Sequence, residues 1–500
     1  MFEGHPKGLK ILFFTEMWER FGFYTMLAVF VYYLQENFKW DEATATNVYG
    51  IFLAGVYFTP VFGGWLADNI LGYGKTITIG AIIMCAGYAL MATPTSEPLF
   101  LYFALAIVAL GNGLFKANIS VLVGNLYGHA EKSLKDAGFN IFYMGINVGA
   151  FFAPFAASGI KDYVMNNFGL SLANGYNAAF GIASAGMIIS VLVFLIFRKY
   201  YISADYQSKN TVNKEKDIVL TPKQEKDRIL ALITIFGIVI FFWMAFHQNG
   251  AALSLFARDF THQNVNKLTF LLFDVVTLVS IIIVLLGIAG LFNKKKTAKD
   301  NFINLIFLAA GLAVIIFKYL SYSNQNQISP EEFQSFNPMF IVLLTPLLIK
   351  FFGFLNKKEK EPSSPAKIGI GMFLAGISFL IMMFVSFGLP AVHSLNGSAS
   401  SITVSPFYLI GTYFMITIAE LHLSPMGLSF VSKVAPPKLK GLMMGGWFGA
   451  TAIGNYLSGF VGRFYQNWEL WQFFLLLVVF AFLGAVMIRF ALKKLKAATE

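Results

Sequence analysis

Long apolar stretches alternate with short polar ones along nearly the whole chain. Fourteen of these stretches are long enough to cross a bilayer, because a transmembrane helix needs about 20 mostly apolar residues. The pattern predicts an all-α polytopic membrane protein, and a content of 57% hydrophobic and 13% charged residues agrees with it. The predicted spans are 9–34, 47–70, 76–94, 98–123, 138–158, 175–198, 229–256, 268–291, 302–320, 336–355, 367–388, 404–430, 440–462 and 468–492.

The Lys and Arg residues between the spans are distributed unevenly. With alternate loops on alternate sides, the side of both termini carries 27 of the 37 and the other side five. The positive-inside rule therefore predicts cytoplasmic termini and a plasma (inner) membrane protein. It also supports the pair of spans within 268–320, because Lys294, Lys295, Lys296 and Lys299 would otherwise face outside. The positive-inside rule thus accounts for the net charge of +11, and no nucleic-acid partner is expected.

The longest polar stretch, 198–228, divides the chain into two halves and indicates a cytoplasmic linker. Two halves of about six helices around a midplane site are typical of the major facilitator fold. We expect an N-terminal six-helix bundle at 1–198, a linker at 199–228, the first helix of the C-terminal bundle at 229–266, an inserted helix pair at 267–333 and the rest of that bundle at 334–500.

Three charged residues interrupt the first apolar stretch. Glu16, Glu19 and Arg20 share one helix face, because side chains three and four positions apart are neighbours on a helix. Since each charge at the bilayer centre costs about 2.5–3.5 kcal/mol, this face indicates an ion or substrate pathway. A static ion pair between helices is the plain alternative, because a buried pair alone is weak evidence of function.

Charges also lie inside later spans, with Lys116 in the N-terminal half and Glu420 in the C-terminal half. If the halves face one another, the cavity between them is positive at Arg20 and Lys116 and negative at Glu420. A dipeptide zwitterion carries opposite charges about 7 Å apart and suits such a cavity. An anion site would not favour Glu420, and a cation site would not favour the two bases.

Several motifs resemble the proton-coupled oligopeptide transporter family (POT/PTR) of the major facilitator superfamily. Each is weak alone, but their order and spacing are specific and cover nearly the whole chain. They are the Glu16-x-x-Glu19-Arg20-Phe21 run, the loop from Gly63 to Lys75, Gly111-Asn112-Gly113 with Lys116, Phe142-Tyr143-x-x-Ile146-Asn147, Phe336-Asn337-Pro338, Ser363-Ser364-Pro365, Glu420-Leu421-x-Leu423-Ser424-Pro425 and Met443-Met444-x-x-Trp447-Phe448.

The resemblance implies a two-bundle major facilitator fold with two inserted transmembrane helices, about 14 spans. It also implies a proton-coupled symporter, functional as a monomer in the lipid bilayer, that imports di- and tripeptides and needs no cofactor or metal. By resemblance, the peptide carboxylate binds Arg20 and Lys116 and the amine binds Glu420, while Lys116 and Glu420 pair when the site is empty. Further substrate-binding residues implied are Tyr24, Tyr57, Tyr143, Asn147, Gln248, Asn337 and Trp447.

The same resemblance assigns proton coupling to the trio in the first span, with Glu19 as first choice of proton carrier and Glu16 as second. A neighbouring carboxylate and burial raise a carboxylate pKa while a neighbouring Arg lowers it, so such a group can titrate near neutral pH. The chain departs from the family at Leu27, usually Arg, and at His247, usually an acid. His247 can replace that acid as a proton-responsive group or be a neutral, hydrogen-bonded histidine.

Other functions stay open at this point. The same fold could carry another small solute, such as an amino acid, a peptide-like compound or nitrate, although Glu420 argues against nitrate. A non-transport intramembrane protein is less favoured. An enzyme is not expected, because the chain has no His-Glu-x-x-His, phosphate-loop or nucleophile-elbow motif. The inserted pair departs from bacterial relatives in its position, and Asp274 and Lys318 within it are expected to pair.

Overall fold

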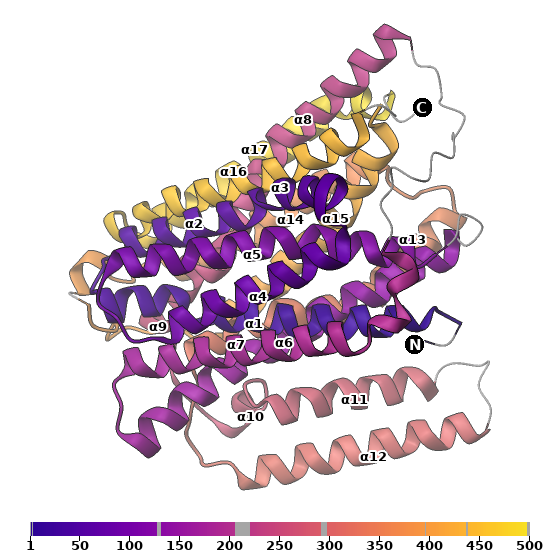
Figure 1. The fold of residues 1–500 in the computed structure, drawn as a ribbon. Helices are drawn as coiled ribbons and strands as arrows, with labels where there is room; N and C mark the ends of the chain where they lie inside the picture. The colour runs from indigo at the N-terminus through magenta and orange to yellow at the C-terminus, as the bar shows by residue number, and fades with distance from the viewer. Residues whose placement is uncertain are drawn as a thin grey trace.

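The chain forms two helical bundles, and a computed structural model describes most of it (Figure 1). The described residues are 2, 4–127, 132–205, 221–291, 298–395, 397–436 and 439–497. They are almost entirely helical, so the prediction of an all-α polytopic membrane protein is confirmed. Eleven of the helical segments are long and apolar enough to span a membrane.

The N-terminal bundle contains seven α-helices in six traverses, because α2, α3 and a π-helical turn together make one. Its elements are α1 (Lys7–Phe38), α2 (Glu42–Phe58), α3 (Pro60–Leu66), η1 (Ala67–Leu71), α4 (Tyr73–Ala92), α5 (Pro98–Asn125), α6 (Lys132–Phe168), α7 (Leu172–Ile196), η2 (Arg198–Tyr200) and η3 (Ile202–Ala204). The rest of the predicted linker up to 220 lies outside the described residues.

The C-terminal half contains the other described helices and a small two-stranded ribbon. Its elements are α8 (Pro222–Phe246), η5 (His247–Gly250), α9 (Ala252–Phe260), β1 (Asn264–Val265), α10 (Lys267–Phe270), α11 (Val275–Leu291), α12 (Ala298–Ser321), β2 (Asn326–Gln327), η6 (Pro330–Ser335), α13 (Phe336–Lys357), α14 (Ser364–Val385), η7 (Val392–Leu395), α15 (Pro406–Val434), α16 (Lys440–Asn467) and α17 (Leu470–Ala497).

Capping residues explain where several helices begin. The side chain of Asp41 accepts from the backbone N–H of Thr44 at the start of α2, which satisfies a free donor of the first turn. Thr221 and Gln224 form a capping box, and Pro222 follows at the first helical position. Helix α8 therefore begins inside the predicted linker, earlier than the expected start at 229.

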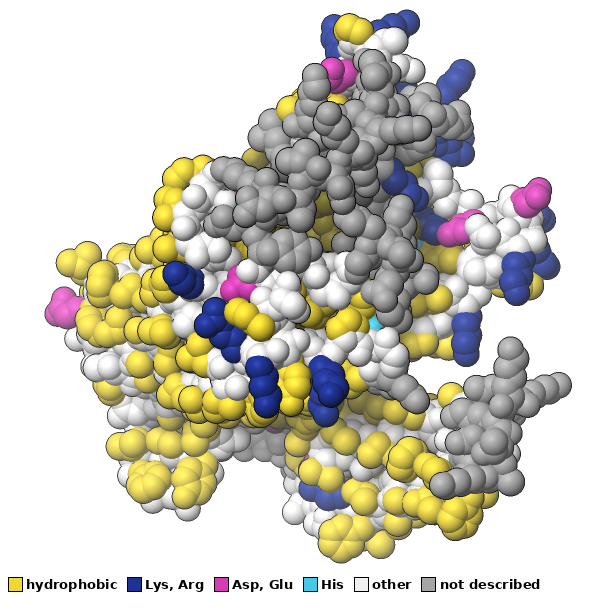
Figure 2. Space-filling model, turned by 45° about the vertical axis from the view of Figure 1, so that its right-hand side comes forward, with side chains coloured by type: hydrophobic (Ala, Val, Ile, Leu, Met, Phe, Trp, Pro, Cys, Tyr) yellow, Lys and Arg dark blue, Asp and Glu magenta, His cyan; other side chains and the backbone are white. Residues whose placement is uncertain are grey.

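The two termini lie at one end of the molecule, which we call the inner end, together with the loop 358–363 and the described residues 435–436 and 439. Figure 2 turns this end toward the viewer and shows Lys and Arg side chains spread over it with fewer Asp and Glu side chains. The opposite, outer end carries the loops 39–41 and 169–171 and the described residues 386–395 and 397–405.

Helices α2 and α16 form the closest contact between the two bundles. Gly50 of α2 packs on Gly459 of α16, where an added Cβ on Gly50 would come within 2.6 Å of the Gly459 Cα. Small residues let membrane helices approach this closely, and their packing replaces the hydrophobic drive that lipid does not supply. Helix α6 makes the second contact, with α13 and η6 of the other bundle.

Helices α11 and α12 form a hairpin on the flank of the molecule (Figure 1). They pack mainly on each other, and only 11% of the apolar window of α12 is buried. The antiparallel ribbon of β1 and β2 ties the base of the hairpin together. Nζ of Lys318 lies 2.6 Å from Oδ2 of Asp274, so the expected ion pair within the inserted helices is present.

Candidate functional site

A cavity of about 250 Å³ lies between the two bundles. All but two of the predicted site residues line it, from α1, α2, α5 and α6 on one side and η5, α13, α15 and α16 on the other. Those that line it are Glu16, Arg20, Tyr24, Tyr57, Lys116, Tyr143, Asn147, His247, Asn337, Glu420 and Trp447. Residues separated by more than 400 positions in the sequence therefore share one site.

The charged trio of α1 is fully buried. Arg20 donates from Nη2 to Oε1 of Glu19 at 2.6 Å and from Nε to the other oxygen of the same carboxylate. Glu16 lies 3.5 Å from Nε of Arg20, and its Oε2 has no hydrogen-bond partner among the described residues. The two acids therefore differ, because Arg20 binds both oxygens of Glu19 and leaves one oxygen of Glu16 unsatisfied.

Lys116 reaches the cavity from α5, and no Asp or Glu among the described residues forms an ion pair with it. Its Nζ lies 4.0 Å from the ring centroid of Tyr57, a cation–π contact. The Tyr57 ring packs edge-on against His247 at 6.0 Å, and His247 also stacks on Trp243 at 5.7 Å between centroids. Nε2 of His247 is buried without a hydrogen-bond partner among the described residues.

Glu420 reaches the cavity from α15 on the opposite side. Its Oε2 accepts from Nδ2 of Asn337 at 2.9 Å, and the same amide donates to Oγ1 of Thr417 at 3.0 Å. No Lys or Arg among the described residues forms an ion pair with Glu420. A neutral amide thus orients this carboxylate and leaves its charge uncompensated.

Aromatic and amide side chains line the wall between these charges. Asn147 is buried and donates from Nδ2 to the backbone oxygen of Tyr143, one turn earlier on α6. Trp447 of α16 is also buried, and its ring packs directly on the backbone of Gly427 in α15. A Cβ at Gly427 would come within 1.9 Å of the Trp447 ring, so only glycine allows this ring position.

Two predicted site residues lie outside the cavity. Glu19 points into the N-terminal bundle, where Nδ2 of Asn112 lies 3.5 Å from its Oε1. Gln248 is fully buried and donates from Nε2 to the backbone oxygen of Ser458 at 3.0 Å, so it joins η5 to α16. In this structure Gln248 therefore makes a helix-packing contact, and its expected contact with substrate stays a prediction.

The predicted Lys116–Glu420 pair is not formed in this structure. Both residues are described and both line the cavity, but Lys116 contacts Tyr57 and Glu420 contacts Asn337. The pair stays a prediction for a state in which the inner end is closed.

The cavity also contains polar residues that the sequence analysis did not select, among them Asn249, Gln334, Ser424 and Thr451. Ser424 stands in a motif already recognised, and Thr451 lies one helical turn after Trp447, so helical spacing could have identified both. Gln334 stands on the short helix before Asn337 and has no such signal.

Among the described residues, the side-chain hydrogen bonds and ion pairs between the bundles gather toward the outer end. In the described part of the chain these include Tyr32 to Ser254, Lys161 to Glu331 and Gln35 to Arg258. Leu428 and Phe448, which line the cavity on its inner side, are exposed. The cavity is therefore closed toward the outer end.

Comparison with known proteins gives the same family from sequence and from structure. The model of the POT family matches residues 74–224 and 319–470, and the unmatched stretch between them holds the inserted hairpin. A protein of Bacillus subtilis strain 168 named an uncharacterized transporter, YclF, is 31% identical over 93% of this chain and 89% of its own length. The di-/tripeptide transporter of Lactococcus lactis subsp. cremoris is 30% identical over 91% of this chain and 89% of its own.

Solved structures show the same arrangement of helices. A peptide transporter POT in complex with alafosfalin superposes with a TM-score of 0.74 at 26% identity, covering 100% of this chain and 96% of that one. A bacterial homologue of the human drug peptide transporters superposes with a TM-score of 0.70 at 25% identity, covering 98% and 99%. The major facilitator fold expected from the sequence is thereby confirmed.

Proposed function

Because this chain belongs to the POT family of membrane transporters, we propose that it is a proton-coupled symporter that imports di- and tripeptides. It is not an enzyme, and its cavity binds the peptide noncovalently. Transport proceeds by alternating access, in which the two bundles rock about the site between them.

One observation carries the assignment of substrate. Lys116 and Glu420 line the same cavity from opposite bundles, and neither forms an ion pair with any described residue. Uncompensated charges in a low-dielectric site attract an oppositely charged ligand strongly. A zwitterion satisfies both at once, with its carboxylate on Lys116 and its amine on Glu420.

The direction of transport follows from the two ends of the molecule. The excess of Lys and Arg residues supports a cytoplasmic inner end in the plasma membrane. Since the contacts between the bundles lie toward the outer end, the described conformation is the inward-facing one. Import then requires these outer contacts to open and the inner end to close, with Lys116 and Glu420 approaching each other.

The geometry favours Glu16 over Glu19 as the proton carrier, which reverses the order expected from the motif. Glu16 lines the cavity and has an oxygen that no described residue hydrogen-bonds, where a proton can be taken up. Both oxygens of Glu19 are held by Arg20, and a bidentate Arg–carboxylate pair is among the strongest side-chain contacts. Arg20 can therefore lose its contact with Glu16 and remain paired.

The direct test is uptake of labelled dialanine into proteoliposomes with and without an inward proton gradient. Saturable accumulation that needs the gradient is expected. A folded, correctly oriented sample without dialanine flux would reject peptides as substrates and would call for a screen of other small solutes.

The charge assignment has its own test in blocked peptides. Amidated dialanine lacks the carboxylate, and N-acetyl dialanine lacks the amine. Because a hydrogen bond to a charged group is worth about 1.5–3 kcal/mol, each block is expected to weaken inhibition of uptake by about 10–100-fold. In Lys116→Gln, amidated dialanine should inhibit uptake as well as free dialanine does. In Glu420→Gln, the same should hold for N-acetyl dialanine.

A matched control is Lys39→Gln, which removes an exposed lysine on the outer surface whose ion pair among the described residues is with Glu36. It should leave both blocked peptides as weak as in the parent protein. If each block weakens inhibition equally in the parent, Lys116→Gln and Glu420→Gln proteins, these two residues do not bind the ends of the peptide.

A further inference from the structure

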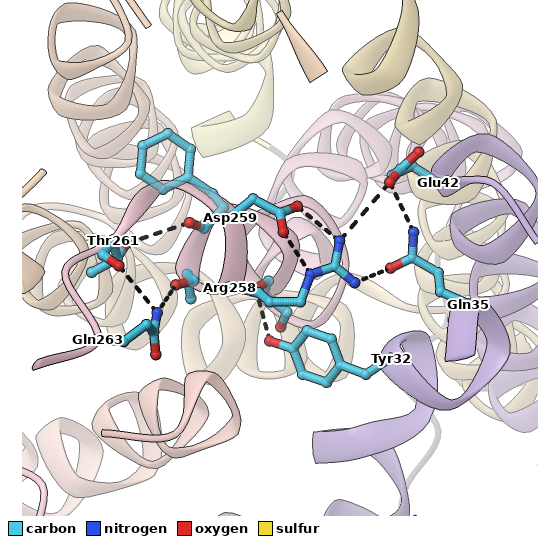
Figure 3. Close-up of polar contacts among 10 residues, drawn as sticks. Tyr32, Gln35, Glu42, Arg258, Asp259, Thr261 and Gln263 are labelled. Atoms are coloured by element: carbon cyan, nitrogen blue, oxygen red, sulfur yellow. Dashed lines mark hydrogen bonds and ion pairs between the residues drawn. The ribbon is translucent and has the colours of Figure 1, made fainter. Parts of the chain in front are cut away.

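A polar cluster at the outer end joins the two bundles around one arginine. Arg258 of α9 donates from Nη1 to Oε1 of Gln35 in α1 at 2.6 Å. Its Nη2 lies 3.9 Å from Oε1 of Glu42 in α2, and the same oxygen accepts from Nε2 of Gln35 at 3.0 Å. Figure 3 shows the guanidinium reaching from one bundle to this pair on the other.

Arg258 has a second set of contacts on its own helix. Its Nε donates to Oδ1 of Asp259 at 2.6 Å and its Nη2 to Oδ2 at 2.8 Å. Figure 3 shows Asp259 on one side of the guanidinium and Gln35 with Glu42 on the other. The bidentate pair stays within the C-terminal bundle, so rocking of the bundles does not break it.

We propose that Arg258 is the latch of the outer gate. When the outer end opens, Arg258 keeps Asp259 and exchanges Gln35 and Glu42 for water. The inference rests on the alternating-access part of the proposed function and does not depend on the substrate being a peptide.

The exposure of the cluster supports a reversible contact. The Arg258 side chain is 32% exposed and borders an outer pocket that Gln35, Glu42 and Trp40 also line. Breaking a buried pair leaves an uncompensated charge, whereas an arginine that keeps one carboxylate and gains water avoids that cost. The other ion pair between the bundles in the described chain, Lys161 to Glu331, is almost fully buried and has no comparable access to water.

The end of α9, which carries Arg258, is hydrogen-bonded to other parts of the C-terminal bundle. The backbone oxygen of Asp259 accepts from the N–H of Ser400 at 2.8 Å, and that of Phe260 accepts from Val404 at 2.8 Å. Nε2 of Gln263 donates to the backbone oxygen of Ala257 at 2.6 Å. The end of α9 therefore moves with its own bundle, and the contacts of Arg258 to α1 and α2 report the separation of the bundles.

The wall of the cavity below the latch includes Leu27, which is apolar, and His247. His247 forms no ion pair with any residue that the structure describes. In the described chain, the ion pairs that cross between the bundles are those of Arg258 and of Lys161. Weakening the Arg258 contacts should therefore shift the protein toward its outward-open state.

The test measures outward opening directly. Leu27→Cys, in a Cys85→Ser background, places a single thiol in the cavity, and a membrane-impermeant thiol reagent is added to the outer face of right-side-out vesicles. Adding Gln35→Ala should raise the labelling rate about fivefold, the population factor of one net hydrogen bond. Adding Asp259→Asn should lower the rate at least twofold, because Asn offers one neutral acceptor in place of the two charged oxygens and Arg258 then depends more on its partners across the gate.

Adding Lys39→Gln is the control, since the ion pair that Lys39 forms among the described residues, with Glu36, stays within the N-terminal bundle. It should leave the labelling rate unchanged. An unchanged or slower rate in Gln35→Ala would overturn the latch, as would faster labelling in Asp259→Asn. If Asp259→Asn does not fold, Gln35→Ala against Lys39→Gln decides alone. Because no substrate is present, failure to transport dialanine would leave this result intact.

Discussion

Arg20 holds both carboxylate oxygens of its sequence neighbour Glu19 inside the N-terminal bundle. Helical geometry usually directs adjacent side chains to different sides, but the long Arg20 side chain turns back to its neighbour. Glu16, one turn earlier, has a single contact with Arg20, and its other oxygen, beside the cavity, has no hydrogen-bond partner in the described part of the chain. The same arginine thus binds Glu19 through both carboxylate oxygens and Glu16 through one contact only.

Glu16→Gln should uncouple transport from protons. The amide keeps the size of the side chain but cannot bind and release a proton. We expect gradient-driven accumulation of dialanine to fall at least tenfold while exchange at zero gradient continues, measured in proteoliposomes. Accumulation that persists in Glu16→Gln would place the coupling proton elsewhere.

Glu19→Gln should act mainly on stability. Removing one partner of a buried ion pair costs about 3–5 kcal/mol, because the remaining charge is left without compensation. We expect a Tm several degrees below that of the parent protein in detergent. Glu36→Gln removes an exposed partner of Lys39 and should change the Tm by a degree or less. Equal Tm values for the two variants would contradict the structural role of Glu19.

Gly427→Ala should weaken substrate binding. The added Cβ would lie 1.9 Å from the Trp447 ring, so the ring has to move into the cavity that it lines. Overpacking of this kind costs about 1–3 kcal/mol, and we expect the KM for dialanine to rise about three- to tenfold. Gly411→Ala, on the same helix with open space at its Cβ, is the control and should keep the KM of the parent.

Glu361 gives a pH dependence at the inner end. The hydrogen bond from the buried Lys367 lowers the pKa of this loop carboxyl below its usual value. A lowered pKa adds stability that is complete above the unfolded-state value near 4.5 and is lost as the pH falls through the folded-state value. We therefore expect Glu361→Gln to have a lower Tm than the parent at pH 7 and the difference to shrink below pH 4. A constant difference across this range would contradict the pairing.

Much of the fold follows from hydropathy alone, because each span must satisfy its backbone in lipid and is long and apolar as a result. The cavity residues could be predicted from the sequence for a different reason. Lys116 and Glu420 are charged residues inside membrane spans, and such residues are rare and usually functional. Sequence patterns could not give the orientation of Gln248. Helix α8 ends at Phe246, and the tighter turn that follows breaks the spacing on which a helical-face argument depends.

The Arg258 cluster was beyond sequence reasoning for another reason. Gln35 and Arg258 are more than 200 positions apart, and both stand near the ends of apolar stretches where polar residues are ordinary. Their contact exists only because two bundles close on each other. One conformation of the protein carries this contact, and no local pattern encodes it.

The strand ribbon at the base of the α11–α12 hairpin bears on how this part of the protein can change during evolution. Because β1 and β2 pair directly, the chain leaves the core after α9 and returns to it before α13 at nearly the same place. The transport core does not have to rearrange around the extra helices. The hairpin thus enters and leaves the core at one place in the chain, and we expect changes in its length to leave the arrangement of the other helices intact.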